Sequence, residues 1–509
     1  MARGLSLTGP VHNDWDGQSF PHPPGRKPVV GDGLSIDREG PLSSFVRIGH
    51  ALGPIFEIMV FRQKFVFVAG AELAAQMCNE QVFAKKLSPA LTELRAFVGD
   101  GLFTAHTEEP NWDLAHTLLM PAFTRSAMQG YHPVMLRTVR ELLSYWSALE
   151  GPVDVSRDMT KLTLETLSRA ALGRDFASFE SEEPHPFIAA MITALRSGQL
   201  KAVARTSPGG RRAVARIDRK VAPAQAYVDE LLDDVIAERR RTGDTSTDDL
   251  LGLMLNAEHP ETGRRLSDVN IRHQVLTFLV AGHETTSGAL SFTLYYLSRH
   301  PHVVRALQAE VDAVLGPDPA AEPTFEQVAK LRGVRRALDE ALRLWPTAPA
   351  FGRGPRHETV QLSTGHTMRP QDWAIVLLPL VHRDPSVWGD DAESFDPDRF
   401  LPERARSRPA HTYKPFGTGE RACIGRQFAL HEAVLVLATL LHRFDLSGDP
   451  DYELAISERL TLMPQGFELE LTPRTPRPSA PPTHDDAAAA HAATASGCPH
   501  GRDRPAPSE

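Results

Sequence analysis

One short run of the sequence constrains the fold and chemistry of this chain more than any other: FGTGERACIG, at positions 416–425. Two glycines precede Cys423 in this run, and a segment whose apolar residues recur at helical spacing, from Leu430 to Leu441, follows it. A cysteine in a loop that leads into a helix meets backbone N–H donors and the positive end of the helix dipole, and both favour the thiolate. The run therefore allows a metal-binding thiolate, but a buried structural thiol is the usual role of a lone cysteine and is the preferred interpretation of Cys423 taken by itself.

The other residues of this run suit a flat ring system beside the sulfur. Gly417 and Gly419 permit a left-handed or tightly turned backbone, and Gly425 would let a planar group approach without a clash with a Cβ atom. Phe416 can pack beside the sulfur, and the guanidinium of Arg421 can pair with an anionic substituent at the edge of the ring. The run therefore predicts a cofactor-binding loop.

A second constraint is the apolar stretch LTFLVAGHETTSGALSF, at positions 276–292, which is typical of a helix buried on all sides. Polar residues at 283–287 interrupt it, and burying them costs free energy unless they are hydrogen-bonded. Gly282 beside Thr285 weakens the helix locally, so we expect a widened turn that holds water or O2. The alternative is an internal hydrogen-bond network with a structural role. The conflict between burial and polarity favours a functional site.

Helical patterns dominate the rest of the chain. Two β-rich runs, 56–70 and 461–473, mix alternation with turn residues and predict a small sheet. We predict a mainly α fold with a small β region, formed by a single large domain over residues 25–473. The flanking segments, 1–24 and the Pro/Ala-rich 474–509, are expected to be flexible.

Composition and charge exclude several classes of protein. A hydrophobic fraction of 41% and a charged fraction of 23% exclude a mainly disordered or fibrous chain. The net charge is -9 and the basic residues are scattered, so no nucleic-acid partner is expected. Cys78, Cys423 and Cys498 are too far apart for a disulfide framework. No apolar run is long enough for a signal peptide or a membrane anchor, so we expect a cytoplasmic location.

The run at 416–425 matches every fixed position of Phe-x-x-Gly-x-Arg-x-Cys-x-Gly, so it resembles the haem-binding loop of cytochromes P450. The resemblance implies haem b (iron protoporphyrin IX) with Cys423 as the axial thiolate, whose electron donation favours cleavage of the O–O bond. The segment AGHETT is similar to the family's helix across the distal haem face. By that resemblance Ala281 lies over the iron, Thr285 orders water and oxygen, and Glu284 relays protons from solvent.

Other motifs are similar to the same family. Trp112 and His116 match its helix whose Trp and basic residue meet a haem propionate. Glu340, Arg343 and Arg399 resemble its Glu-Arg-Arg triad, a structural lock behind the cysteine loop. From the residues alone, Glu340 and Arg343 would be an ordinary surface ion pair at helical spacing.

Longer runs, including GDGLFTAHTEEPNW and RACIGRQFALHEAVLVL, resemble the haem domain of bacterial fatty-acid hydroxylases with fused reductases, over residues 25–473. Two departures stand out. No flavin or nicotinamide signature follows Pro473, and Gln63 and Phe67 stand where those hydroxylases carry an Arg and a Tyr that hold the fatty-acid carboxylate. Neighbouring Arg62 and Lys64 are doubtful substitutes, because adjacent β residues point to opposite faces. The resemblance implies that Phe103 gates a substrate pocket lined by Leu91, Val98, Val280, Ala281, Ala348 and Leu460.

We therefore expect an O2-dependent monooxygenase that hydroxylates or epoxidises an apolar small molecule. The substrate is either a secondary metabolite of polyketide, terpenoid or lipopeptide type, or a long-chain fatty acid. NAD(P)H electrons would arrive through a separate ferredoxin or flavodoxin and its reductase, with a docking face that includes Arg404, Arg406, Arg421 and Arg426. The alternatives are a peroxide-driven haem oxidase and a non-catalytic haem sensor or carrier. Glu284 and Thr285 favour the monooxygenase, because mere binding needs no proton relay.

Overall fold

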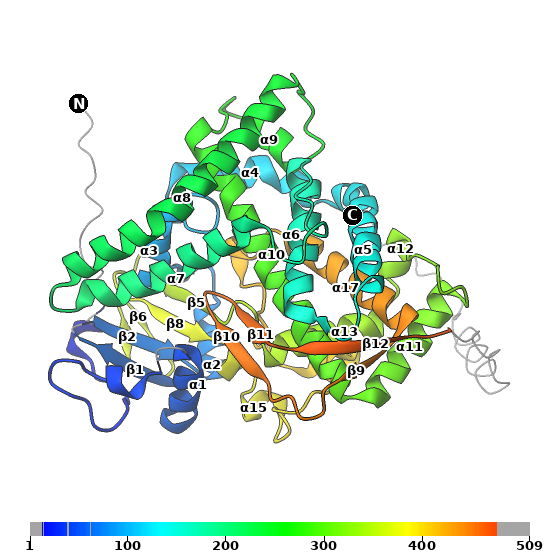
Figure 1. Cartoon of the computed structure of the whole chain (residues 1–509). Helices are drawn as coiled ribbons and strands as arrows, with labels where there is room; N and C mark the ends of the chain where they lie inside the picture. The colour runs from blue at the N-terminus through cyan, green and yellow to red at the C-terminus, as the bar shows by residue number, and fades with distance from the viewer. Residues whose placement is uncertain (1–12, 14, 38–39, 62, 476–509) are drawn as a thin grey trace, which may run out of the picture.

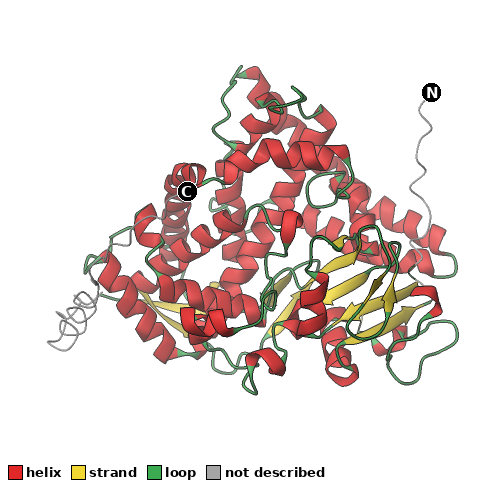
Figure 2. Ribbon diagram, turned by 180° about the vertical axis from the view of Figure 1, so that it is seen from behind, coloured by secondary structure: helices red, strands yellow, loops and turns green. Residues whose placement is uncertain are grey.

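The computed structural model describes residue 13 and residues 15–37, 40–61 and 63–475. Helices make up most of these residues and the strands form small sheets, so the predicted mainly α fold with a small β region is confirmed. Figure 1 shows α10 passing through the middle of the helical part, and Figure 2 shows most strands gathered at one side of the molecule.

The helices are α1 (Pro41–Leu52), α2 (Ala71–Met77), α3 (Pro89–Val98), α4 (Pro110–Leu119), α5 (Arg125–Ser147), α6 (Val155–Leu172), α7 (Pro186–Thr206), α8 (Gly210–Arg241), α9 (Leu250–Asn256), α10 (Asp268–Arg299), α11 (Pro301–Leu315), α12 (Phe325–Val328), α13 (Arg332–Leu344), α14 (Leu378–Val381), α15 (Pro385–Trp388), α16 (Pro402–Ser407) and α17 (Arg426–Arg443).

The strands are β1 (Ile55–Val60), β2 (Gln63–Val68), β3 (Phe83–Lys85), β4 (Val153–Asp154), β5 (Ala350–Pro355), β6 (Val360–Gln361), β7 (Thr367–Met368), β8 (Ala374–Leu377), β9 (Phe444–Gly448), β10 (Ala455–Glu458), β11 (Leu462–Gln465) and β12 (Glu468–Pro473). They form a five-stranded sheet in the order β1-β2-β8-β5-β3, a three-stranded sheet β4-β12-β9, and the pairs β10-β11 and β6-β7. Both β-rich runs of the sequence therefore form strands.

The main hydrophobic core joins α5, α6, α10, α13 and α17. Each of these helices contributes fully buried aliphatic side chains, such as Leu290 of α10 and Leu435 of α17. Burying one such side chain contributes about 1.5–3 kcal/mol. Ser267 caps α10 by accepting the backbone N–H of Asn270 (3.2 Å), which fixes where this helix begins. α10 and α17 thus pack in the same core.

The packed part of the chain begins before residue 25 and extends past residue 473. Trp15 is fully buried, and its indole N–H donates to the carbonyl oxygen of Trp373 (3.2 Å). The side chain of Asn13 donates to the same carbonyl (2.9 Å). At the other end, Arg474 forms an ion pair with Asp312 (2.7 Å). Residues 1–12, 14 and 476–509, Cys498 among them, lie outside the described residues.

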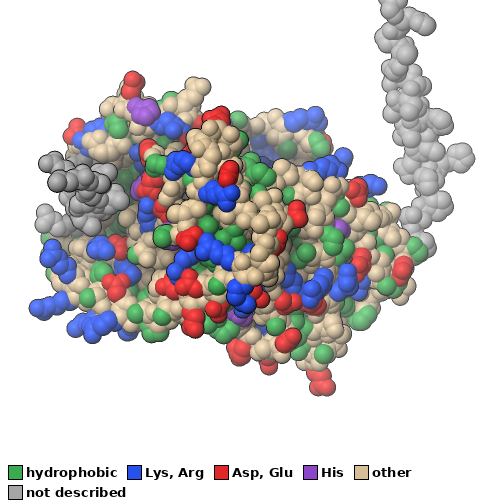
Figure 3. Space-filling view, turned by 90° about the horizontal axis from the view of Figure 1, so that it is seen from above, with side chains coloured by type: hydrophobic (Ala, Val, Ile, Leu, Met, Phe, Trp, Pro, Cys, Tyr) green, Lys and Arg blue, Asp and Glu red, His purple; other side chains and the backbone are tan. Residues whose placement is uncertain are grey.

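Figure 3 shows acidic and basic side chains interspersed over the face seen from above, as the scattered charges of the sequence predict. Over the ranges that the structure describes, no helix is both long enough and apolar enough to cross a bilayer.

Candidate active site

Cys423 lies at the end of the loop that leads into α17. Its backbone N–H donates to the carbonyl oxygen of Phe416 (2.8 Å), which folds the loop back on itself. Burial raises the pKa of the Cys423 thiol, and the Gly425 N–H and Arg426, which act in the opposite direction, do not outweigh it. The Gly425 N–H and Arg426 thus act toward the thiolate, as the sequence predicts, and burial acts against it. A metal ion at the sulfur would stabilise the thiolate further.

Two glycines shape this loop. Gly417 and Gly419 have φ angles of +72° and +63°, in the left-handed region that favours glycine. A side chain at Gly419 would also collide with the carboxylate of Glu80. Glu80 is itself held by an ion pair with Arg353 of β5 (2.8 Å). The loop therefore rests directly on a charged pair formed by Glu80, in the turn before β3, and Arg353 of the sheet.

Cys423 lines a cavity that is bounded by the cysteine loop, α3, α10 and the turn between β10 and β11. Most of the predicted site residues line this cavity: Leu91, Phe103, Trp112, His116, Val280, Ala281, Glu284, Thr285, Ala348, Phe416, Gly417, Arg421, Cys423, Gly425 and Leu460. Val98 is not part of the wall, because its side chain is buried in the apolar cluster that surrounds α3.

The middle of α10 brings Glu284 and Thr285 to the cavity wall. α10 is α-helical over its whole length, so the expected widened turn does not form. The Thr285 hydroxyl instead donates to the carbonyl oxygen of Ala281 (2.9 Å). Glu284 is 2% exposed, and its Oε1 accepts from Nη1 of Arg459 (3.0 Å) in the β10–β11 turn. Sequence reasoning missed Arg459, because nothing in the sequence connects this turn to α10.

Aromatic and basic side chains form one edge of the cavity. Trp112 and His116 stack with ring centroids 5.1 Å apart, and the guanidinium of Arg421 lies 4.7 Å from the centre of the Trp112 ring. Lys85 of β3 is half-buried beside them and donates to the carbonyl oxygen of Phe103. Burial, and then the nearby Arg421, lower the pKa of Lys85. Sequence reasoning missed Lys85, although a lysine after two apolar residues in the short strand FAK could have indicated a charge that faces a site.

Arg421 points into the protein. It donates to the hydroxyl of Thr107 (3.1 Å) and to the carbonyl oxygens of Leu102 (2.9 Å) and Ala105 (2.8 Å). The expectation that Arg421 belongs to a surface docking face is therefore wrong. The other three arginines of that proposed face, Arg404, Arg406 and Arg426, are exposed.

Comparison with known proteins decides what kind of site this is. The family model described as cytochrome P450 matches residues 21–471. The chain belongs to the cytochrome P450 family. Among P450 relatives, the bifunctional cytochrome P450/NADPH–P450 reductase of Bacillus cereus is 44% identical over 458 residues, which are 88% of this chain and 42% of the relative.

Other relatives give the same result. The bifunctional cytochrome P450/NADPH–P450 reductase 1 of Bacillus subtilis is 44% identical over 441 residues, 86% of this chain and 41% of the relative. A self-sufficient cytochrome P450 monooxygenase of Phanerodontia chrysosporium is 40% identical over 466 residues, 90% of this chain and 43% of the relative. This P450 chain thus spans about two fifths of the length of these relatives. The predicted resemblance to P450–reductase fusions is confirmed.

The cavity fits the P450 cofactor, haem. Cys423 could supply a sulfur ligand, and Phe416 and Ala281 would contribute apolar walls for a flat ring. Lys85 and Arg421 are half-buried cations at one edge, and neither forms an ion pair with a carboxylate of a described residue. Two half-buried cations without carboxylate partners favour an anionic group nearby. The two propionates of haem b are anionic groups of this kind.

The Glu340, Arg343 and Arg399 side chains come together in one buried cluster. Glu340 and Arg343 are fully buried and joined by two hydrogen bonds of 2.7 Å, and Arg399 Nε lies 3.4 Å from Glu340 Oε1. Arg399 also donates to the carbonyl oxygen of Trp388 (2.8 Å). The alternative of an ordinary surface pair is therefore excluded.

The predicted carboxylate-binding positions lie away from the cavity. Phe67 is 2% exposed and packs against Phe45 and Phe56, with ring centroids 4.7 and 5.2 Å apart. Gln63 lies at the start of β2, outside the cavity wall. Lys64 forms an ion pair with Glu57 (3.3 Å), and Arg62 lies outside the described residues. None of the described side chains of β2 brings a cation to the cavity.

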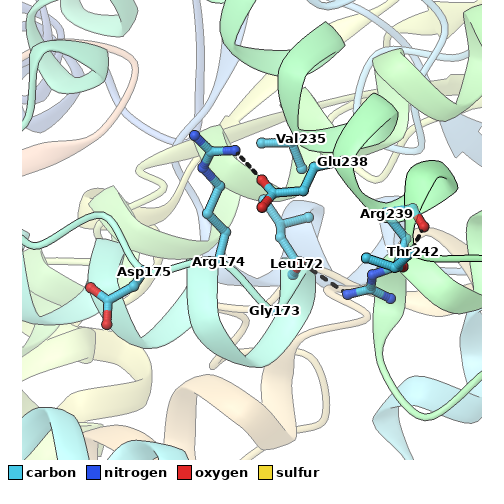
Figure 4. A pocket seen from close by; sticks show the side chains of 8 residues that line it. All are labelled: Leu172, Gly173, Arg174, Asp175, Val235, Glu238, Arg239 and Thr242. Atoms are coloured by element: carbon cyan, nitrogen blue, oxygen red, sulfur yellow. Dashed lines mark hydrogen bonds and ion pairs between the residues drawn. The ribbon is translucent and has the colours of Figure 1, made fainter. Parts of the chain in front are cut away.

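A second hollow lies where the C-terminal ends of α6 and α8 meet. Figure 4 shows Arg174 directed toward Glu238, and Arg239 directed toward Leu172. Arg174 donates to the Glu238 carboxylate (2.8 Å), and Arg239 donates to the carbonyl oxygen of Leu172 (3.1 Å). Arg239 also pairs with Asp249 (2.9 Å). Both guanidinium groups are engaged by acceptors of the protein itself. Their hydrogen bonds connect the ends of the two helices, so this hollow is interpreted as structural.

Proposed function

We propose that this P450 is a monooxygenase that inserts one oxygen atom from O2 into an apolar small molecule, by hydroxylation or epoxidation. The observation that carries the proposal is the cavity in which Cys423 lies on one wall and the acid and alcohol of α10, Glu284 and Thr285, lie on another. A protein that only binds haem has no use for a buried acid and a hydroxyl at this position.

Haem, when bound, supplies the metal at which O2 is reduced and its O–O bond is cleaved. The Thr285 hydroxyl, now bonded to the carbonyl oxygen of Ala281, can rotate to donate to oxygen or water in the cavity. Glu284 keeps one carboxylate oxygen, Oε2, without a hydrogen-bond partner among the described residues, so this oxygen can accept a proton and pass it on.

The lining of the cavity favours a neutral, apolar substrate. Away from the cysteine loop the wall is formed by aliphatic and aromatic side chains, among them Leu91, Phe103, Leu195 and Leu460. The cations Lys85 and Arg421 lie on the side where haem propionates are expected. A polyketide, terpenoid or lipopeptide-like metabolite therefore fits better than a long-chain fatty acid, whose carboxylate would lack a partner.

We propose that electrons come from NAD(P)H through a ferredoxin or flavodoxin and its reductase. The exposed Arg404, Arg406 and Arg426 offer positive charge to such an acidic partner. One of these, Arg404, pairs with Asp396 (3.0 Å) and contributes less than the other two.

Thr285→Ala tests the proposed reaction. In a reconstituted system with O2, NAD(P)H and a reductase, we expect the variant to consume NAD(P)H but to form several-fold less product per NAD(P)H, because the hydroxyl in the cavity is lost. Thr293→Ala is the matched control, since Thr293 is buried on the same helix, makes the same type of bond to Ala289 (2.7 Å), and does not line the cavity. Unchanged product yield in Thr285→Ala would contradict the mechanism. Greater turnover with peroxide than with O2 would favour the peroxide-driven alternative.

A spin-state titration tests the substrate class. Long-chain fatty acids are compared with their methyl esters and with neutral terpenoid ligands of similar size. We expect the neutral compounds to bind more tightly, because Lys85 and Arg421 are assigned to the haem propionates and the wall away from the cysteine loop is formed by aliphatic and aromatic side chains. Tighter binding of the free acids would contradict this reasoning.

A further inference from the structure

The turn between β10 and β11 lies against α10 at the position of the acid. The turn is tight, with the Arg459 N–H donating to the carbonyl oxygen of Thr461 (3.0 Å). From it the Arg459 side chain reaches Glu284, placing Nη1 3.0 Å from Oε1. Glu284 is buried, whereas the Arg459 side chain is 22% exposed. Arg459 thus connects the buried acid to the edge of the protein.

Glu284 and Arg459 form a largely buried ion pair in which each side chain keeps one polar atom without a hydrogen bond. Oε2 of Glu284 and Nε of Arg459 are both buried without a hydrogen-bond partner among the described residues. A carboxylate buried in an apolar wall is costly unless a cation compensates it. Arg459 is the only described cation within ion-pair distance of Glu284. The position of the turn and the charge of the acid therefore depend on each other.

The same turn carries part of the cavity wall. Leu460, the next residue, lines the cavity, and Thr461 lines it as well. The backbone carbonyl oxygen of Arg459 accepts from the side-chain amide of Gln199 in α7 (2.8 Å). α7 in turn contributes Leu195 to the wall. Arg459 is therefore the point where α7, the β10–β11 turn and the acid of α10 meet.

We propose that Arg459 is a positioning residue that anchors the β10–β11 turn to α10 through Glu284. Through this anchor the acid assigned to proton delivery also fixes the wall that contacts the substrate. A change at Glu284 then alters the fit of an apolar ligand that touches Leu460, and a change at Arg459 alters proton delivery. The inference rests on the proposed function only in giving Glu284 that role.

A double-mutant cycle on ligand binding tests the anchor. Arg459→Gln, Glu284→Gln and the combined variant, each loaded with haem, are titrated with clotrimazole, a bulky apolar azole, and its affinity is read from the Soret shift. Each single variant should bind clotrimazole roughly two- to tenfold more weakly, and the combined variant no more weakly than either one, because both changes break one contact. Imidazole, which lacks the apolar part, should bind all variants equally.

Two further variants sharpen the result. Glu458→Gln in the same hairpin removes the charge and one of the two carboxylate oxygens that accept the Leu42 and Ser43 N–H groups, so its effect should multiply with that of Glu284→Gln. Arg459→Lys keeps the charge and should bind clotrimazole more tightly than Arg459→Gln. Multiplying losses in the Arg459 and Glu284 cycle, or equal losses for imidazole, would overturn the anchor.

Turnover gives a separate answer. If O2-dependent turnover occurs, Arg459→Gln should form less product per NAD(P)H than the unmutated protein, and an unchanged yield would overturn the link to proton delivery. If the unmutated protein shows no such turnover, the proposed function fails, and the clotrimazole cycle still decides whether Arg459 anchors the wall.

Discussion

Replacing Glu340 by Gln should destabilise the protein strongly, although the two side chains have nearly the same size and shape. Burial raises the pKa of Glu340, although Arg343 and the N–H of Asp396 act in the opposite direction. The carboxylate thus bears a large desolvation cost, which the buried charge of Arg343 compensates. Without that carboxylate, Arg343 is a fully buried cation with no ionic partner, a loss of about 3–5 kcal/mol in comparable buried pairs.

The structure places Glu340→Gln at the lower end of this range. Gln can still accept one hydrogen bond, and Arg343 keeps three backbone acceptors, the carbonyl oxygens of His382, Ala392 and Ser394, at 2.7–3.0 Å. We therefore expect a loss of about 3 kcal/mol. Glu340→Ala, which also leaves a cavity, should lose more.

Urea unfolding followed by circular dichroism measures the loss, with Glu258→Gln as the control. Glu258 pairs with Arg265 at the same distance of 2.7 Å, but both side chains are more than half exposed, so this change should cost less than about 1 kcal/mol. Similar losses of unfolding free energy in the two variants would refute the reasoning, because burial would then have no influence on how much an ion pair contributes to stability.

Three further outcomes are expected. Cys423→Ser should abolish the red-shifted absorption of the ferrous carbonyl complex, and an unchanged spectrum would exclude Cys423 as the ligand. Gly101→Ala should lose about 1–3 kcal/mol in urea unfolding, because its Cβ would collide with the hydroxyl of Thr277, whereas Gly130→Ala, in open space on α5, should gain about 0.5–1 kcal/mol. Burial raises the pKa of Glu432 from 4.5 to about 8, so the folded state holds a proton that the unfolded state releases. Stability should therefore fall as pH rises from about 5 to about 8, and Glu432→Gln should remove that part of the slope in unfolding measured across this range.

The sequence alone predicted Cys423 as the ligand, which stays a prediction, and it predicted the two main helices of the site. The run around Cys423 and the polar interruption of the apolar stretch at 276–292 are local patterns, and local backbone preferences and periodicity are enough to predict a loop before α17 and a buried α10. The mainly α fold followed for the same reason, because helical spacing is visible within each segment.

Only the tertiary structure decided which charges face the cavity. Arg421 points inward, Lys85 lies beside it, and Arg459 reaches Glu284, although long stretches of sequence separate these pairs. Phe67, at a position where the sequence suggested substrate binding, is buried against other aromatic rings. Local sequence does not encode such placements, because the cost of burying a charge depends on partners that folding brings in from distant segments.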